Sequence, residues 1–143
     1  MILFIDDSDY MGSFIEGLCE RKIKVDWAKN FYDATDSLDD DPGEIYYNAI
    51  ILDLAMSNKG LPDKAKELAD KVFPGWAFYK YVIAPNYSRL KEKTIFLSGF
   101  PENFKEKIGE TEYKCLNVVT KGHNQVQNVI DMLKKLDVLY VGS

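Results

Sequence analysis

Four short apolar runs recur along the chain, at residues 2–5, 49–52, 95–97 and 118–119, and each leads into polar side chains. Such runs are typical of strands that are buried on both faces, as in a parallel sheet. A shorter segment at residues 25–27 has the character of one more strand. The pattern therefore predicts five strands.

Apolar residues at helical spacing lie between several of these runs. The stripes are Met11, Phe14, Ile15, Leu18 and Cys19, then Phe31, Ala34 and Leu38, and finally Val126, Val129, Ile130 and Leu133. Such stripes indicate amphipathic helices, and we expect Ser8 or Asp9 to cap the first helix and Asn30 the second. Strands that alternate with helices predict an α/β fold, a doubly wound parallel sheet covered by helices on both faces.

The stretch from residue 55 to residue 89 is the least regular part of the pattern. Its apolar residues at helical spacing are Ala65, Leu68, Ala69 and Val72. Pro62 suits the first turn of a helix, whereas Pro74 and Gly75 interrupt one. We therefore expect an extra helix at residues 62–72, within an insertion of about residues 57–74, and another helix at residues 76–83.

Composition and charge narrow the class of protein. The chain is 46% hydrophobic and 29% charged, and its 143 residues predict a single domain over residues 1–143. A net charge of −5 and the lack of a basic cluster argue against nucleic acid as a partner. The first apolar run is too short for a signal peptide and no stretch approaches a membrane span, so we expect a cytoplasmic protein without a membrane partner.

Two cysteines, Cys19 and Cys115, lie far apart in the sequence and lack the spacing of metal ligands. We expect both to be reduced thiols that act as small buried hydrophobes. A disulfide between them stays open as an alternative.

Polar side chains with related chemistry follow four of the predicted strands: Asp6 and Asp7, Asp53, Ser98, and Lys121. The carboxyl ends of parallel strands lie along one edge of a sheet, where ligands bind, so we expect these five side chains to meet there. Three neighbouring carboxylates repel one another, and Mg²⁺ prefers carboxylate, water and phosphate oxygens. A lysine and a hydroxyl can neutralise a phosphate, and a carboxylate can act as a nucleophile toward phosphorus.

The four blocks at residues 2–7, 50–54, 96–99 and 118–121 resemble the conserved blocks of response-regulator receiver domains. The resemblance covers nearly the whole chain and implies a flavodoxin-like sheet with strand order 2-1-3-4-5. It also implies that Asp53 is the phosphoacceptor and that Mg²⁺ binds Asp7 directly, Asp6 mostly through water, Asp53, and the backbone carbonyl of Ala55.

The same resemblance implies roles for the remaining residues and for partners. Ser98 would move to hydrogen-bond the phosphoryl oxygen, and Lys121 would pair with it. The phosphoryl group would come from a sensor histidine kinase, a phosphotransfer protein or a small phosphodonor, and would change a surface that binds a downstream protein effector. The protein would then be a signalling switch and not an enzyme in its own right, with a homodimer as an open alternative.

The chain departs from the receiver pattern at several positions. Gly122 stands where receivers usually have a proline after a cis bond, and Val118 stands where they usually have a switching aromatic residue. In receivers, the positions of Phe100 and Ala55 influence how water reaches the phosphoryl group, and the apolar residues here predict a long-lived phosphorylated state. The inserted helix should lie beside the mouth of the site, as a lid, a docking element or a plain loop insertion.

Two other functions fit part of the pattern. Asp7-Ser8-Asp9 resembles the Asp-x-Asp motif of haloacid-dehalogenase phosphatases, with Asp7 as the nucleophile, but Asp53 would then have no role. A degenerate receiver that binds partners independently of phosphate is the second alternative, which the departures at Val118 and Gly122 keep open.

Overall fold

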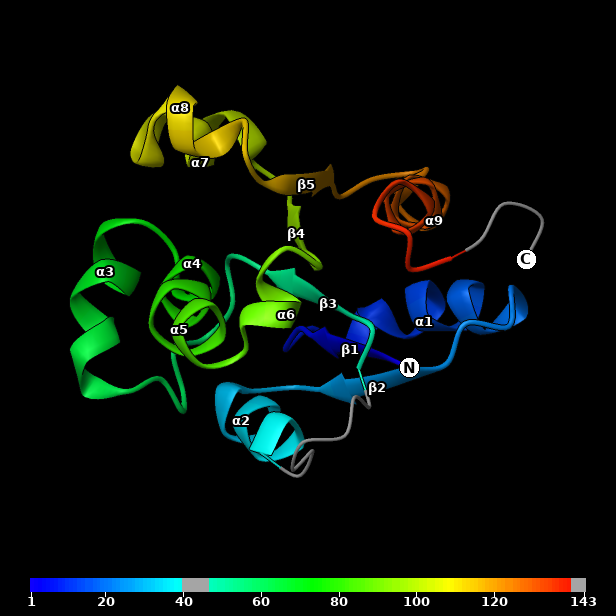
Figure 1. Cartoon of the computed structure of the whole chain (residues 1–143), viewed down its shortest axis with the longest axis horizontal. Helices are drawn as coiled ribbons and strands as arrows, with labels where there is room; N and C mark the ends of the chain where they lie inside the picture. The colour runs from blue at the N-terminus through cyan, green and yellow to red at the C-terminus, as the bar shows by residue number, and fades with distance from the viewer. Residues whose placement is uncertain (40–46, 140–143) are drawn as a thin grey trace.

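In a computed structural model of the chain, residues 1–39 and 47–139 are described, and they form a five-stranded sheet with helices on both faces (Figure 1). The strands are β1 (Ile2–Ile5), β2 (Val25–Ala28), β3 (Ala49–Asp53), β4 (Thr94–Ser98) and β5 (Asn117–Thr120). Neighbouring strands pair in parallel, in the order β2-β1-β3-β4-β5. The predicted α/β class and the 2-1-3-4-5 order are confirmed.

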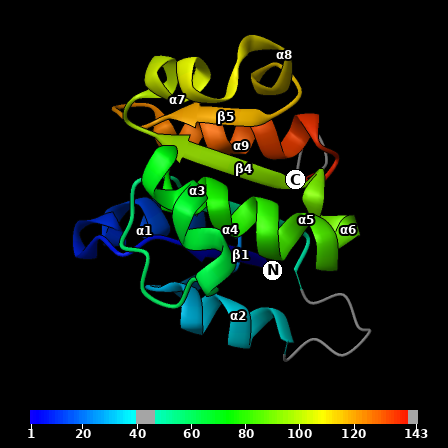
Figure 2. The same cartoon turned by 90° about the vertical axis from the view of Figure 1, so that its left-hand side faces the viewer.

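Alternate residues of the strands point into two separate cores. On one face Ile2 and Phe4 pack with the 3₁₀ turn η1 (Asp9–Met11), α1 (Gly12–Glu20) and α9 (Gln125–Lys135). On the other face Leu3, Ile5 and Phe96 pack with α2 (Phe31–Asp39), the helices between β3 and β4, and α7 (Pro101–Ile108). A short α8 (Glu110–Tyr113) follows α7. Figure 2 looks onto this second face, with α2 and α7 on either side of the helices that precede β4.

The segment between β3 and β4 contains the predicted extra helix. It forms as a 3₁₀ turn, η2 (Asp63–Ala65), that continues into α3 (Lys66–Lys71). The predicted helix at residues 76–83 is longer than expected: α4 (Pro74–Phe78) continues through a π-helical turn, η3 (Tyr79–Ile83), into α5 (Ala84–Asn86), and α6 (Ser88–Lys91) follows. Pro85 has no N–H for the ordinary helical bond, which accounts for the wider turn before it.

Two local predictions are corrected by the structure. Neither Ser8 nor Asp9 caps α1, which begins after Met11 without a side-chain capping bond. Asp9 lies within η1, and the Ser8 side chain hydrogen-bonds the Asp6 carboxylate instead. Cys19 and Cys115 are free, as predicted, but exposed and not buried. Leu18 fills the core-facing position beside Cys19 on α1. The predicted cap of α2 is present, since the side-chain oxygen of Asn30 accepts a bond from the Asp33 N–H at 2.8 Å.

No helix within the described ranges is both long and apolar enough to cross a membrane. The predicted single domain over residues 1–143 includes residues 40–46 and 140–143, which lie outside the described part of the chain.

Candidate functional site

The candidate residues lie where four parallel strands end. Asp6 and Asp7 follow β1, Asp53 is the last residue of β3, Ser98 is the last residue of β4, and Lys121 follows β5. A backbone bond of 2.9 Å from the Lys121 N–H to the Ser98 carbonyl holds the last two of these ends together. The parallel register therefore brings side chains from four distant parts of the sequence to one edge.

Three carboxylates meet at this edge. Asp6, Asp7 and Asp53 each offer an oxygen atom within 4.8 Å of the others. Asp6 and Asp53 are buried whereas Asp7 is exposed. Burial raises the pKa of Asp53 and of Asp6, and the charge of Asp53 raises the pKa of Asp6 further. Ionising all three carboxylates without a cation is therefore energetically unfavourable, because water is largely excluded from two of them.

Lys121 supplies a positive charge to this cluster. Its ammonium nitrogen lies 2.9 Å from Oδ1 of Asp53 and 3.6 Å from Oδ2 of Asp6. Burial alone would lower the pKa of Lys121, but its hydrogen bond with Asp53 and the charges of Asp53 and Asp6 raise the pKa above the ordinary value. Lys121 therefore stays protonated at neutral pH, and its ammonium pairs with two of the three carboxylates.

A divalent cation fits the donors that remain. Oδ1 of Asp6 accepts a 2.9 Å bond from the Ser8 N–H, whereas its buried Oδ2 has no hydrogen-bond partner among the described residues. Oδ2 of Asp7 is held at 2.9 Å by the Ser57 N–H. Carboxylate oxygens together with water and phosphate oxygens are the ligands that Mg²⁺ prefers, so Oδ2 of Asp6 and its neighbouring carboxylates fit the ion.

Two further contacts support the acidic cluster. The Ala55 N–H donates to the Asp53 carboxylate, which lowers the pKa of Asp53 and so opposes part of the effect of burial. The indole N–H of Trp27, on β2, donates to the backbone carbonyl of Asp6 at 2.8 Å. This contact of Trp27 was not predicted, although the place of Trp27 near the end of β2, beside β1, is the signal that could have pointed to it.

A cavity of about 290 Å³ opens beside Asp53. Its lining includes Ser8, Tyr10, Asp53, Ala55, Phe73, Ser98, Phe100 and Lys121. The side-chain oxygen of Ser98 accepts a 3.0 Å bond from the Phe100 N–H, so the hydroxyl proton stays available for an incoming oxygen. Carboxylate, ammonium and hydroxyl groups therefore share one small cavity, and Phe73 and Tyr10 were not singled out by sequence.

The end of β3 and the start of α4 touch each other directly. The Gly75 N–H donates to the Leu54 carbonyl at 2.9 Å, and a Cβ on Gly75 would lie 2.3 Å from the Asp53 carbonyl oxygen. A side chain at residue 75 would therefore push α4 away from Asp53.

Gly122 and Val118, the two residues near the end of β5 that differ from the receiver pattern, are both placed by the structure. No peptide bond in the described ranges is cis, so the Lys121–Gly122 bond is trans, and the Gly122 N–H donates to the side chain of Gln125 at 3.2 Å. Val118 is half-buried and packs against the core that contains Phe96.

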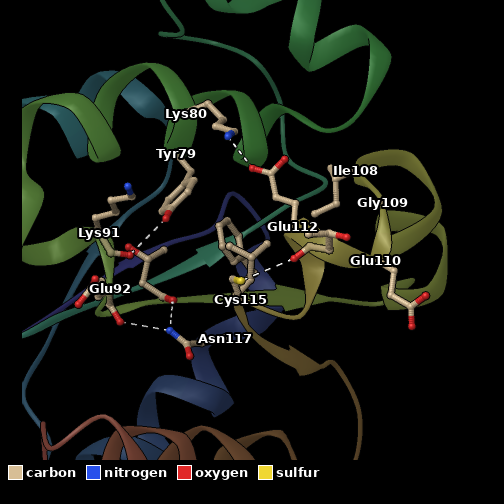
Figure 3. Close-up of a pocket in the computed structure, with 14 residues that line it drawn as sticks. Tyr79, Lys80, Lys91, Glu92, Ile108, Gly109, Glu110, Glu112, Cys115 and Asn117 are labelled. Atoms are coloured by element: carbon tan, nitrogen blue, oxygen red, sulfur yellow. Dashed lines mark hydrogen bonds and ion pairs between the residues drawn. The ribbon is translucent and has the colours of Figure 1, made fainter.

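A larger cavity of about 820 Å³ lies between η3 and α8, near the amino ends of β4 and β5 (Figure 3). Two polar pairs lie in its lining: Lys80 with Glu112 at 2.6 Å, and the Asn117 amide with the Glu92 carbonyl at 3.2 Å. The carboxylates of the acidic cluster do not line it. We therefore assign the candidate chemistry to the smaller cavity.

Comparisons with known proteins bear on the fold. No protein-family model matches the chain, and no curated protein matches it. Among solved structures, the receiver domain of NtrX from Brucella abortus has a TM-score of 0.65 at 14% identity, over 97% of this chain and 100% of that one. The chemotaxis protein CheY4 of Vibrio cholerae has a TM-score of 0.63 at 19% identity, over 94% and 96% of the two chains.

A two-component response regulator from Clostridium difficile is also similar, with a TM-score of 0.61 at 17% identity over 99% of this chain and 98% of that one. Identities this low show the fold alone. The chain has the fold of response-regulator receiver domains.

Proposed function

We propose that this chain is a phosphorylation-dependent signalling switch in which Asp53 accepts a phosphoryl group. The observation that carries the proposal is the 2.9 Å contact between the Lys121 ammonium and a buried Asp53, in a cavity beside two further carboxylates. The receiver fold supports it, because a protein with this architecture places ligands at the carboxyl ends of its strands.

Mg²⁺ fits the donors at this edge. Asp6, Asp7, Asp53 and the backbone carbonyl of Ala55 would hold the ion, which when bound would neutralise phosphoryl oxygens during transfer. The buried Oδ2 of Asp6, which has no hydrogen bond among the described residues and only a 3.6 Å ion pair with Lys121, supports this assignment.

The transfer step follows from the chain's own groups. A carboxylate oxygen of Asp53 attacks the phosphorus of a phosphohistidine or a small phosphodonor, and a new P–O bond forms. The P–N bond of the phosphohistidine breaks and its electron pair stays on the imidazole nitrogen, which takes up a proton from solvent. Lys121 loses its carboxylate partner at the same moment and can pair with a phosphoryl oxygen. Ser98 donates its free hydroxyl proton to another oxygen.

Partners follow from the same proposal. The donor would be a sensor histidine kinase or a phosphotransfer protein, and the phosphorylated form would bind a downstream protein effector through an altered surface. The chain would assist its own phosphorylation and dephosphorylation only.

Intact mass after incubation with phosphoramidate and Mg²⁺ tests the proposal. We expect one added phosphoryl mass in the natural protein and in Asp63→Asn, which alters an exposed carboxylate outside the site, and none in Asp53→Asn. A label on Asp7 would instead indicate phosphatase chemistry of the haloacid-dehalogenase type. A well-folded protein that takes up no phosphate would favour the phosphate-independent interaction module, which the residues at Val118 and Gly122 suggest.

A further inference from the structure

The inserted segment between β3 and α4 reaches the acceptor cavity through a single aromatic residue. Phe73, between α3 and α4, lines the same cavity as Asp53 and Lys121. We propose that Phe73 is a gate that limits the access of small molecules to Asp53, and that α7 holds this gate in place. Its consequence for phosphoryl chemistry rests on the function proposed above.

The position of Phe73 is fixed from the side of the acceptor. Its backbone is extended, and its carbonyl accepts a 3.1 Å bond from the Ala77 N–H in α4. Two residues further on, the Gly75 N–H binds the Leu54 carbonyl directly after Asp53. These two backbone bonds therefore hold Phe73 at the wall of the cavity and restrict its movement relative to α4.

The ring of Phe73 is also fixed from the side of α7. It meets the ring of the fully buried Phe104 edge-on, with centroids 6.1 Å apart. The ammonium of Lys107 lies 4.8 Å from the centroid of the Phe73 ring and 3.3 Å from the Val72 carbonyl oxygen. Both anchors come from a single helix, so a displacement of α7 would release the ring.

Phe73 differs from Phe100, the other phenylalanine in the lining of this cavity. Phe100 is 69% exposed and so has few neighbours to hold it, whereas Phe73 is half-buried between α4 and α7. A held ring narrows a cavity of about 290 Å³ more reliably than an exposed one. Loss of the Phe73 ring should therefore widen the approach to Asp53 without touching its charge partners.

Thiol chemistry measures this access without any phosphoryl transfer. Asp53→Cys would be made on a Cys19→Ser, Cys115→Ser background, which removes the two exposed natural thiols. We expect iodoacetamide to alkylate Cys at position 53 slowly, Phe73→Ala to raise the rate severalfold, and Lys107→Met to raise it less. The Phe73→Ala effect should grow when the reagent is the bulkier N-ethylmaleimide.

Lys105→Met is the matched control, because Lys105 is also on α7 but lies over the Tyr113 ring and not over Phe73. It should leave the alkylation rate unchanged. Equal rates with and without the Phe73 ring would overturn the gate. If Asp53→Cys fails to fold, Ser98→Cys reports on the same cavity, since Ser98 is a buried part of its lining.

Phosphate uptake separates the gate from the proposed function. With uptake, Phe73→Ala should shorten the lifetime of phosphorylated Asp53 severalfold and Lys105→Met should not. Faster alkylation in a protein that takes up no phosphate would refute the switch and leave the gate standing. Normal uptake with unchanged alkylation and an unchanged lifetime would refute the gate and leave the switch standing.

Discussion

The ammonium nitrogen of Lys121 lies 2.9 Å from a carboxylate oxygen of Asp53 and 3.6 Å from one of Asp6. Lys121 thus pairs with the same two buried carboxylates that a divalent cation would bind. The lysine stabilises the cluster when no metal is bound and competes with the metal when one binds. This double role determines the response of the site to mutation and to pH.

The first prediction concerns the competition between Lys121 and Mg²⁺. Lys121→Met leaves three carboxylates without an ammonium, so Mg²⁺ should bind more tightly, by about tenfold or about 1.4 kcal/mol. Isothermal titration calorimetry would measure the affinity. Lys71→Met is the control, because Lys71 pairs with the exposed Glu67 on α3 outside the cluster and should have little effect. Unchanged or weaker Mg²⁺ binding in Lys121→Met would contradict the assignment.

The second prediction concerns pH. Burial raises the pKa of Asp6 and Asp53 above 3.8, so the folded protein keeps these protons at a pH where the unfolded chain has lost them. Stability rises with pH only where the unfolded state binds more protons, so this cluster makes the free energy of unfolding fall as the pH rises from 3.8 through the raised pKa values.

Urea unfolding at a series of pH values, without divalent cations, would measure this fall. Asp6→Asn should flatten it, because the amide cannot ionise, and saturating Mg²⁺ should flatten it in the natural protein. Asp9→Asn changes a carboxylate that is 90% exposed and should keep the slope of the natural protein. If the free energy of unfolding of Asp6→Asn and of the natural protein changed equally with pH, ionisation of the buried Asp6 would not destabilise the fold.

The third prediction concerns the contact between α4 and β3. A Cβ on Gly75 would lie 2.3 Å from the Asp53 carbonyl oxygen and 2.8 Å from the Leu54 Cα. Gly75→Ala should therefore destabilise the protein by about 1–3 kcal/mol, the usual cost of overpacking, and should impair phosphate uptake. Gly12→Ala is the control, since a Cβ there meets nothing within 4 Å. Urea unfolding would compare them, and equal stability of the two variants would contradict the close approach.

The strands and the acidic cluster were readable in the sequence because one local rule governs both. Each of β1, β3 and β4 is an apolar run that ends at or before a polar side chain. The parallel order of the strands then brings these polar side chains to one edge of the sheet. Pairing across strands is not local, so the bond from Trp27 to the Asp6 carbonyl was missed. It depends on the register that sets Phe4 opposite Trp27.

Helices with little buried surface were harder to predict. In α7 only Phe104 is buried, so no stripe of apolar residues marks the helix, and it was not predicted. The exposed position of Cys19 was missed for a related reason, because a thiol at helical spacing looks like a core residue until the neighbouring Leu18 fills the space. Phe73 was overlooked because its role arises only from the contact of the insertion with α7.

The fourth prediction uses Trp27 as a reporter. Its indole N–H binds the Asp6 carbonyl at 2.8 Å, whereas Trp76 is buried in the core on the opposite face of the sheet. Mg²⁺ should therefore change the fluorescence of Trp27 and not of Trp76. Trp76→Phe should keep the fluorescence response and Trp27→Phe should lose it. Calorimetry should find Mg²⁺ bound about fivefold more weakly by Trp27→Phe, from a lost hydrogen bond of about 1 kcal/mol.

The fifth prediction concerns the lifetime of phosphorylated Asp53. Hydrolysis needs a water molecule oriented toward phosphorus, and Ala55 and Phe100, which line the cavity, carry no side-chain group that could orient it. We therefore expect the phosphoryl group to persist well beyond seconds after the donor is removed, as followed by intact mass. Ala55→Asn adds an amide that can hold water and should shorten this lifetime, whereas Ala55→Val stays apolar and should not. Decay within seconds in the natural protein would show that water reaches phosphorus without such help.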